Sequence, residues 1–306
     1  MSRVVLLDGG MGQELIRRAP EPPSDLWSAM VMHRHPDLVR DLHVDFIRAG
    51  ARVITVNSYA ATRDRLARFG LEGEFEKLQR LACRLAHEAR EEVGIEGVRI
   101  AGCLPPLKAS YRWEDADPPE ITAPVYREIV ELQAPHVDLF ICETMASIRQ
   151  AEGALGGVRG CGRPVWLAFT VDDRPTGRLR SGESMAEALA AIRDKEVAAV
   201  LLNCSTPEGI AAALPGLAGA GRPWGAYPNG FPEITEEYRA RQNVSVLAGR
   251  PDLTPERFAG IALGWVRDGA TIVGGCCEIG PAHIAALAAV LTEAGYEIGA
   301  ELEKVV

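Results

Sequence analysis

Residues 4–10 read VVLLDGG, a continuous apolar run that stops at a carboxylate and two glycines. A parallel strand that is buried on both faces is apolar at successive positions, whereas a strand with one wet face alternates apolar and polar residues. The run therefore predicts a buried parallel strand. Seven further runs of this kind follow at 52–59, 98–104, 139–144, 165–171, 199–205, 224–229 and 270–277.

Amphipathic stretches separate these runs. In the first, residues 37–49, the residues Leu38, Leu42 and Phe46 recur at helical spacing. Eight strands alternating with eight helices in 306 residues predict a single (β/α)8 TIM barrel, whose active site lies at the carboxyl ends of the strands. The barrel is expected to span residues 1–295, with a C-terminal tail at 296–306. The other predicted helices lie at 74–93, 122–134, 147–155, 185–193, 208–217, 255–266 and 281–293.

An open, doubly wound parallel sheet is the alternative architecture. Such a sheet usually has fewer strands and a glycine-rich first turn that binds a dinucleotide. Gly9, Gly10 and Gly12 match only part of that fingerprint, and no acidic strand end follows at the required distance. The sequence therefore favours the closed barrel.

Composition narrows the class of protein. The chain is 47% hydrophobic and 25% charged, as globular proteins are, and its formal net charge is −9. This acidic balance argues against nucleic acid as a partner, and no apolar run is long enough for a membrane span. Asp8 comes too early for a secretory signal peptide, and the seven cysteines then indicate a reducing, cytoplasmic location without a disulfide framework. Helix faces of barrels often pair, so a homo-oligomer is possible.

Chemically active side chains gather at the predicted strand ends. Cys204 ends the sixth strand, and Cys276 and Cys277 end the eighth. Only the seventh strand separates them in a barrel, so the three thiols can face one another across the mouth. The other polar or aromatic residues at strand ends are Asp8, Asn57, Ser58, Tyr59, Cys103, Glu143, Thr144, Asn203, Ser205, Tyr227 and Asn229.

Three thiols at neighbouring strand ends indicate a zinc site with its fourth position open. Closed structural zinc sites usually have four protein ligands and CxxC-type spacing, which this chain lacks. The alternative is that the cysteines are small buried apolar residues, and this interpretation is taken for Cys83, Cys103, Cys142 and Cys161. A disulfide between the adjacent Cys276 and Cys277 is not expected, because its ring would be strained.

Zinc that is held by three thiolates is electron-rich and generates hydroxide poorly. It is better suited to binding a fourth, substrate thiol and keeping it deprotonated near neutral pH, where a free thiol of pKa about 8.5 is mostly protonated. The cysteines therefore favour sulfur alkylation over hydrolysis.

The motifs together resemble those of the homocysteine S-methyltransferase family. They occur in order from residue 4 to about residue 288, so the resemblance covers nearly the whole chain. The segments that carry it are LDGGMG at 7–12, DLWS at 25–28, RAGA at 48–51, CET at 142–144, NC at 203–204, YPN at 227–229 and GGCC at 274–277.

The resemblance implies a zinc-dependent barrel enzyme that methylates homocysteine to methionine. Carried over by position, Cys204, Cys276 and Cys277 would be the zinc ligands. Asp8 and Glu143 would hold the substrate ammonium, the alternatives being a turn cap for Asp8 and a buried ion pair for Glu143.

Further roles are expected around this centre. Backbone amides of Gly9 and Gly10 would meet the substrate carboxylate, and Asn203 would orient the ligand loop. Aromatic residues suit a cationic methyl donor, although core packing explains them as well. The residues expected to line such a donor pocket are Trp27, Tyr59 and Tyr227.

Three departures from the family pattern concern the methyl donor. Glu278 follows the cysteine pair, the third strand continues as Cys103-Leu104-Pro105-Pro106, and Thr144 stands where betaine-using members carry tyrosine. A sulfonium donor is therefore preferred over betaine. S-methylmethionine is preferred over S-adenosylmethionine because no adenine-binding signature is visible. Residues 178–183 (RLRSGE) are expected to form a mobile loop over the barrel mouth.

Three other functions stay open. A corrinoid-dependent methyltransferase subunit would need a cobalamin partner. The same scaffold could methylate another thiol or a selenol. A zinc-binding or thiol-binding protein without enzymatic activity is the third possibility, and the two carboxylates argue against it because they favour an amino-acid acceptor.

Overall fold

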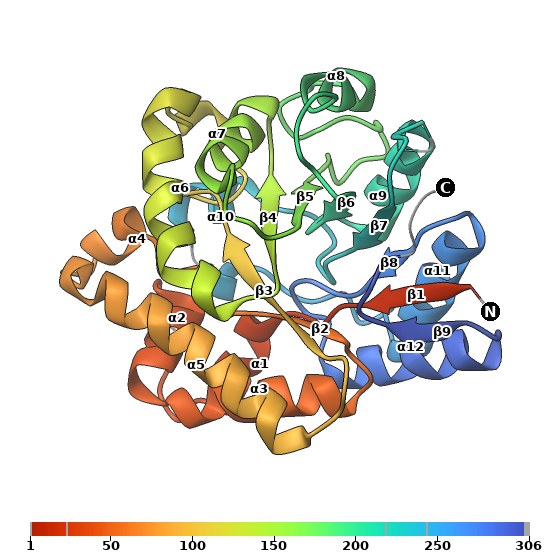
Figure 1. Ribbon diagram of the computed structural model, residues 1–306, viewed down its shortest axis with the longest axis horizontal. Helices are drawn as coiled ribbons and strands as arrows, with labels where there is room; N and C mark the ends of the chain where they lie inside the picture. Colours follow the sequence, from red (N-terminus) through yellow and green to blue (C-terminus); the bar gives the residue numbers. More distant parts are fainter. Residues whose placement is uncertain (1, 23, 218, 243, 303–306) are drawn as a thin grey trace.

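A computed structural model describes residues 2–22, 24–217, 219–242 and 244–302. Its strands form one curled parallel sheet in the order β2-β3-β4-β5-β6-β7-β8-β1-β9, with helices on the outside (Figure 1). The predicted α/β class and barrel-like architecture are confirmed. The strands are β1 Arg3–Leu6, β2 Val53–Thr55, β3 Arg99–Leu104, β4 Leu139–Met145, β5 Val165–Phe169, β6 Ala199–Asn203, β7 Trp224–Tyr227, β8 Ile272–Val273 and β9 Glu297–Gly299.

The ring closes beside β1. On one edge, Val5 of β1 pairs with Ile272 of β8. On the other edge, just beyond β1, a single parallel bridge joins Leu7 to Val53 of β2. On the edge away from β8, β1 also pairs with β9. This ninth strand lies within the segment that the sequence analysis assigned to a C-terminal tail, and periodicity did not predict it because it is only three residues long.

Burial on both faces explains the continuous apolar strands. Successive residues of β5 are buried, as are those of β6. Residues such as Leu7, Ile141 and Leu201 pack together in one cluster inside the ring. Their neighbours along the strands, among them Leu6 and Leu202, belong to a second cluster that the helices cover.

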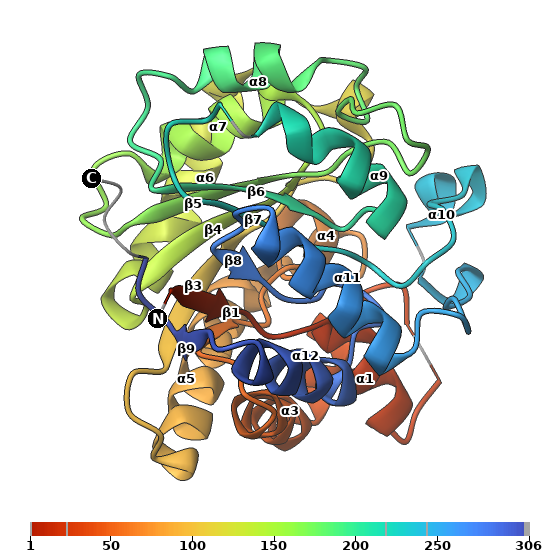
Figure 2. The ribbon, with the colours of Figure 1, turned by 90° about the vertical axis from the view of Figure 1, so that its right-hand side faces the viewer.

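The helices surround the sheet, and Figure 2 shows α3, α11 and α12 packed side by side outside it. Several short helices near the barrel mouth, α1, α2, α4 and α10, were not predicted. The α-helices are α1 Met11–Arg18, α2 Trp27–Arg34, α3 Pro36–Arg48, α4 Arg63–Ala67, α5 Phe75–Val93, α6 Pro119–Gln133, α7 Ile148–Val158, α8 Met185–Ala191, α9 Pro207–Ala213, α10 Glu236–Arg241, α11 Pro255–Arg267 and α12 Pro281–Glu293.

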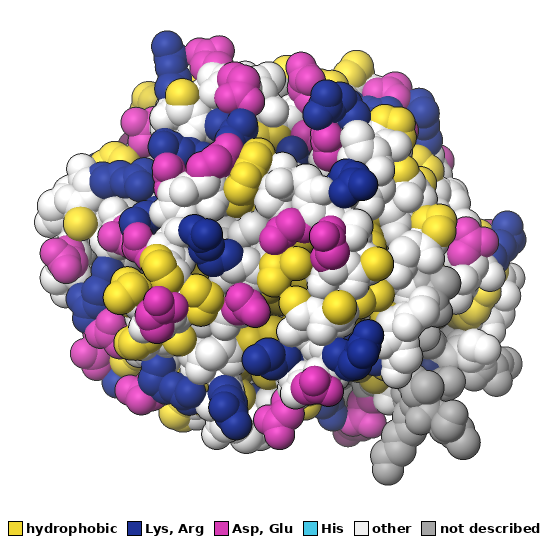
Figure 3. Space-filling model, turned by 90° about the horizontal axis from the view of Figure 1, so that it is seen from above, with side chains coloured by type: hydrophobic (Ala, Val, Ile, Leu, Met, Phe, Trp, Pro, Cys, Tyr) yellow, Lys and Arg dark blue, Asp and Glu magenta, His cyan; other side chains and the backbone are white. Residues whose placement is uncertain are grey.

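The surface is mixed in charge on the face seen in Figure 3, where Lys and Arg side chains are interspersed with Asp and Glu. None of the helices in the described residues combines the length and apolar character that crossing a bilayer requires.

Candidate active site

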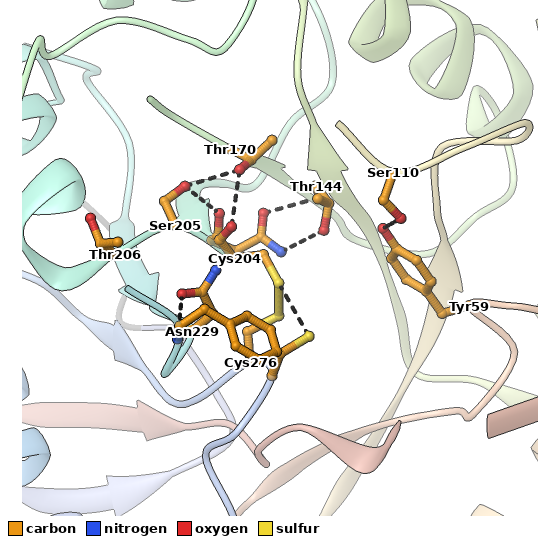
Figure 4. The surroundings of a disulfide bond; sticks show 12 residues. Tyr59, Ser110, Thr144, Thr170, Cys204, Ser205, Thr206, Asn229 and Cys276 are labelled. Carbon is orange, nitrogen blue, oxygen red and sulfur yellow. Dashed lines mark hydrogen bonds between the residues drawn. A yellow bond between two sulfur atoms is a disulfide. The ribbon is translucent and has the colours of Figure 1, made fainter. Parts of the chain in front are cut away.

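The three predicted thiols meet at the carboxyl ends of β6 and β8. The Sγ atoms of Cys204, Cys276 and Cys277 all lie within 4.8 Å of one another. Cys204 and Cys276 are joined by a disulfide, and the Sγ of Cys277 lies 3.8 Å from that of Cys204 (Figure 4). The sequence analysis therefore placed the sulfur cluster as the structure has it.

The disulfide corrects the expectation that the cysteines stay unpaired. It links the ends of β6 and β8, between which β7 lies, and the Cα atoms of the two cysteines are 5.5 Å apart; the adjacent pair Cys276 and Cys277 is not bridged. A sulfur in a disulfide has no thiolate to offer, so a metal requires the reduced form of this pair.

The residues present fit a metal ion. Three cysteine sulfurs are a donor set for a soft or borderline metal, and they leave room for a further ligand from a substrate. Beside Cys277 lies the buried side chain of Gln13, whose amide is oriented by no other side chain among the described residues. Burial raises the pKa of the Cys277 thiol to about 12, and the nearby Gln13 amide opposes this rise.

The loop after β7 ties the two sulfur-bearing loops together. The N–H of Cys204 donates to the carbonyl of Tyr227 at 3.2 Å, and the N–H of Cys276 donates to the carbonyl of Pro228 at 2.8 Å. The N–H of Gly230 donates in turn to the carbonyl of Cys277 at 2.8 Å. Backbone hydrogen bonds thus fix the spacing of the three sulfurs.

The glycines after β1 allow a close approach to the loop of Cys276. A Cβ atom on Gly10 would lie 2.4 Å from the carbonyl oxygen of Cys276, so a side chain is excluded there. The N–H of Gly10 donates to the carbonyl of Ile279 at 2.9 Å. The expectation that this amide is available to a substrate carboxylate is therefore wrong for Gly10. The first turn of α1, which begins at Met11 and includes Gly12, lines the same pocket.

Two carboxylates lie in the wall of this pocket. Asp8 accepts the N–H of Thr55 at 2.8 Å, across to β2. Burial raises its pKa well above the usual range, and the nearby Glu143 adds to this rise. Loss of water also raises the pKa of Glu143 to about 7, against the effect of a hydrogen bond with Cys103.

Among the described residues, no Lys, Arg or His lies within 4.0 Å of either carboxylate, so Glu143 is not part of the ion pair considered from sequence. Buried carboxylates without a cationic partner are costly. The wall of the pocket therefore holds two buried carboxylates, at Asp8 and Glu143, without a cationic side chain beside them in the described parts of the chain.

Asn203 contacts the end of β4 rather than a thiol. Its Oδ1 accepts the N–H of Thr144 at 3.0 Å, and its Nδ2 donates to the Thr144 hydroxyl at 2.9 Å (Figure 4). Because Asn203 precedes Cys204 and Thr144 follows Glu143, these two hydrogen bonds fix the sulfur side relative to the carboxylate side.

Aromatic rings form the outer wall. The predicted Trp27, Tyr59 and Tyr227 line the pocket, and so do Tyr111 and Tyr238, which the sequence analysis missed. The rings of Trp27 and Tyr59 pack edge to face with their centroids 6.1 Å apart. The centroids of the Tyr111 and Tyr238 rings are 5.8 Å apart, also in an edge-on arrangement. The two missed tyrosines lie after β3 and on α10, away from the strand ends where sequence reasoning searched.

A buried ion pair supports the mouth from the segment after β5. The Nη2 of Arg180 lies 2.7 Å from the Oδ1 of Asp173, and each of the two side chains is only 9% exposed. Arg180 also donates to the carbonyl of Cys204 at 3.4 Å and lies 4.6 Å from the ring centre of Tyr111. These contacts hold Arg180, which lies within the predicted loop at 178–183, against the residues of the barrel mouth.

Left-handed backbone conformations gather around the pocket. Among the described residues other than glycine, positive φ angles occur at Trp27, Tyr111, Thr144, Cys204, Gln242 and Glu278. Such conformations are costly for these residue types and concentrate at functional sites. The charge of Glu278, a departure from the family pattern, is paired with Arg17 at 3.1 Å.

Known proteins share this organisation. The profile of the homocysteine S-methyltransferase family matches residues 5–291. A homocysteine S-methyltransferase from Escherichia coli is 30% identical, with 94% of each chain covered. A selenocysteine methyltransferase from Astragalus bisulcatus is 28% identical, covering 95% of this chain and 93% of the relative.

A solved structure agrees with the fold. The metallated form of the Escherichia coli homocysteine methyltransferase MmuM superposes with a TM-score of 0.78 at 28% identity, over 94% of this chain and 96% of that one. Its oxidized form gives a TM-score of 0.76 over the same shares. Since the family profile spans nearly the whole chain, this protein belongs to the homocysteine S-methyltransferase family.

Proposed function

We propose that this protein transfers a methyl group from a sulfonium amino acid to the thiol of homocysteine, giving methionine, with zinc as its metal. The observation that carries this proposal is the meeting of three cysteine sulfurs with two unpaired carboxylates in one pocket. This arrangement suits a ligand that has both a thiol and an ammonium group, as homocysteine has. Family membership supports the reaction type.

The acceptor is held at both ends. Asp8 and Glu143 bind its ammonium, and the charge of that group favours their ionised forms. The first-turn amides of α1, at Met11 and Gly12, together with Gly9, are the donors for its carboxylate. Reduced Cys204, Cys276 and Cys277 would hold the zinc ion.

Zinc bound there would supply a Lewis acid that lowers the pKa of the acceptor thiol towards neutrality. The three cysteines bind a metal only when reduced, and this requirement fits the cytoplasm. Asn203 keeps the two halves of the site in register through Thr144.

The transfer itself needs alignment more than acid–base chemistry. The acceptor thiolate sulfur attacks the methyl carbon, and the bond from that carbon to the donor sulfur breaks. The electron pair returns to the donor sulfur, which leaves as a neutral thioether, and no proton moves in this step. The pocket contributes by holding sulfur, methyl and leaving group in line, while the faces of Tyr59 and Tyr238 favour the sulfonium cation.

S-methylmethionine is the preferred donor, because it presents the same sulfonium as S-adenosylmethionine without a nucleoside that must be accommodated. With this donor both products are methionine. The similarity to a selenocysteine methyltransferase makes a selenol the second candidate acceptor.

One assay tests the proposal. Reduced, zinc-loaded protein is given homocysteine with S-methylmethionine, S-adenosylmethionine or betaine in turn, and methionine is measured. Methionine from a sulfonium donor is expected. Turnover with betaine alone would overturn the donor assignment, and methylation of selenocysteine but not homocysteine would overturn the acceptor. A protein without turnover with any of these pairs is not the proposed enzyme.

A further inference from the structure

A second cavity of about 280 Å³ adjoins the active-site pocket, and the two share the side chains of Trp27 and Tyr238 in their walls. The second cavity is rich in cations. Four basic side chains and one carboxylate line it, although the whole chain carries a net charge of −9. The charged residues in its lining are Asp25, Arg65, Arg68, Lys108 and Arg241.

Arg65 differs from the other three cations of this cavity. Lys108 is paired with Asp117 at 2.7 Å, and Arg241 is paired with Glu237 at 3.1 Å. Arg68 is exposed and donates to the carbonyl of Lys108 at 2.9 Å. Arg65 is partly buried, and within the described residues no carboxylate lies within 4.0 Å of it.

Hydrogen bonds position the guanidinium of Arg65 but do not use all of its N–H donors. Its Nη2 donates to the Pro106 carbonyl at 3.2 Å and to the Ser110 hydroxyl at 3.3 Å, while its buried Nε has no hydrogen-bond partner in the part of the chain that the structure describes. The group lies 5.1 Å from the ring centre of Tyr59. The hydroxyls of Tyr59 and Ser110 lie 2.9 Å apart, and both residues line the active-site pocket (Figure 4).

We infer that Arg65 binds the α-carboxylate of the methyl donor, so that the second cavity continues the donor site away from the sulfurs. This inference rests on the proposed function and specifies its donor as an amino acid. In such a donor three carbon atoms separate the sulfonium from the carboxylate, so the cation can contact the aromatic wall while the carboxylate reaches Arg65.

Arginine suits this role because its planar guanidinium binds a carboxylate through two parallel hydrogen bonds. The competing explanation is structural, since Arg65 also supports the backbone at Pro106. A structural role would affect every donor equally, whereas a carboxylate-binding role affects only donors that carry a carboxylate.

The test compares Arg65→Gln with the wild type on three methyl donors: S-methylmethionine, S-adenosylmethionine and the carboxylate-free trimethylsulfonium ion. The variant is expected to raise KM for the amino-acid donors about 10- to 100-fold, the usual worth of a hydrogen bond to a charged group. For trimethylsulfonium we expect less than about a 3-fold change. Comparison of the first two donors shows which amino acid supplies the carboxylate.

Two further variants separate binding from folding. Arg63→Gln, on the same helix α4, removes an arginine that is paired with Glu128 and lines neither cavity, so all three donors should be unaffected. Ser110→Ala removes a hydrogen bond to Arg65 but keeps its charge, so it should preserve most of the preference for carboxylate donors. Arg65→Lys should restore part of the lost affinity.

An equal loss with all three donors would overturn the inference and leave the proposed function standing. If the wild type makes no methionine, the proposed function fails, and calorimetric binding of S-methylmethionine decides the inference. Binding that Arg65→Gln weakens at least about 10-fold supports it. The absence of binding to the wild type, or equal binding to both proteins, overturns it.

Discussion

The two sides of the active-site pocket are built in different ways. The sulfur and carboxylate side comes from the ends of β1, β4, β6 and β8, and backbone hydrogen bonds hold its loops together. Most of the aromatic side comes from the connections between strands, with Tyr227 at the end of β7 as the exception, and in these connections side chains supply the contacts. The N–H of Ser110, for example, donates to the Oε1 of Gln242 at 2.8 Å, which joins the segment after β3 to the end of α10.

From this difference we expect the strand-end side to carry out the reaction and the aromatic side to determine which methyl donor is used. The strand ends belong to a closed sheet and cannot move independently, so they suit groups whose spacing must not vary. The connections can exchange residues without disturbing the sheet. We therefore expect substitutions on the first side to abolish the reaction and substitutions on the second to change which donor is used.

The largest effect is expected from Cys276→Ser. Loss of one of three sulfurs should reduce bound zinc from about one ion per chain to a trace and lower kcat by roughly 1,000-fold or more. Metal analysis beside the methionine assay measures both. Cys161→Ser is the matched control, since Cys161 lies outside the pocket. If the Cys276→Ser variant bound as much zinc as the wild type, the assignment of the metal to these three sulfurs would be wrong.

Glu143→Gln should have the next largest effect. The substitution keeps the shape of the side chain but leaves the substrate ammonium with Asp8 alone, so KM for homocysteine should rise roughly 100-fold. KM for the donor should change little. The converse result, a change confined to the donor, would assign Glu143 to the other side of the pocket.

How far the sequence predicts each side follows from the same difference. Cys204 and Cys276 lie at the ends of the predicted strand segments, so locating the strands also located the sulfurs. Tyr238 lies on a six-residue helix in a connection without periodicity, and its approach to Tyr111 depends on the folded connections. The disulfide escaped prediction for another reason, because the sequence shows which strand ends are neighbours but not the oxidation state of their thiols.

The pH dependence of acceptor binding sharpens the comparison. In the free protein the pKa of Glu143 is about 7, and only the ionised carboxylate attracts an ammonium group. The affinity for homocysteine should therefore rise with pH through about 7, gaining roughly 10-fold between pH 6 and pH 8 for a single titrating group. Donor affinity, which depends on the aromatic side, should stay flat over this range.

The control for this titration is Glu143→Gln. An amide does not titrate, so the rise near pH 7 that Glu143 causes should disappear in this variant, leaving the pH dependence of Asp8 and of the thiol chemistry. If the wild type and the variant gave parallel profiles, the ionisation would belong to another group, and the assignment of Glu143 to the acceptor would lose its support.

The smallest effect is expected on the aromatic side, from Tyr238→Leu. A ring face near a desolvated cation contributes about 0.5–2 kcal/mol, so removal of the ring should raise KM for a sulfonium donor roughly 2- to 30-fold. KM for homocysteine should stay within a factor of about two, because the ammonium site lies with the two carboxylates. Tyr238→Phe keeps the ring and should behave as the wild type. Steady-state kinetics with each substrate varied in turn separates these outcomes. A larger effect on homocysteine than on the donor would mean that the outer wall also positions the acceptor, and the division between the two sides would fail.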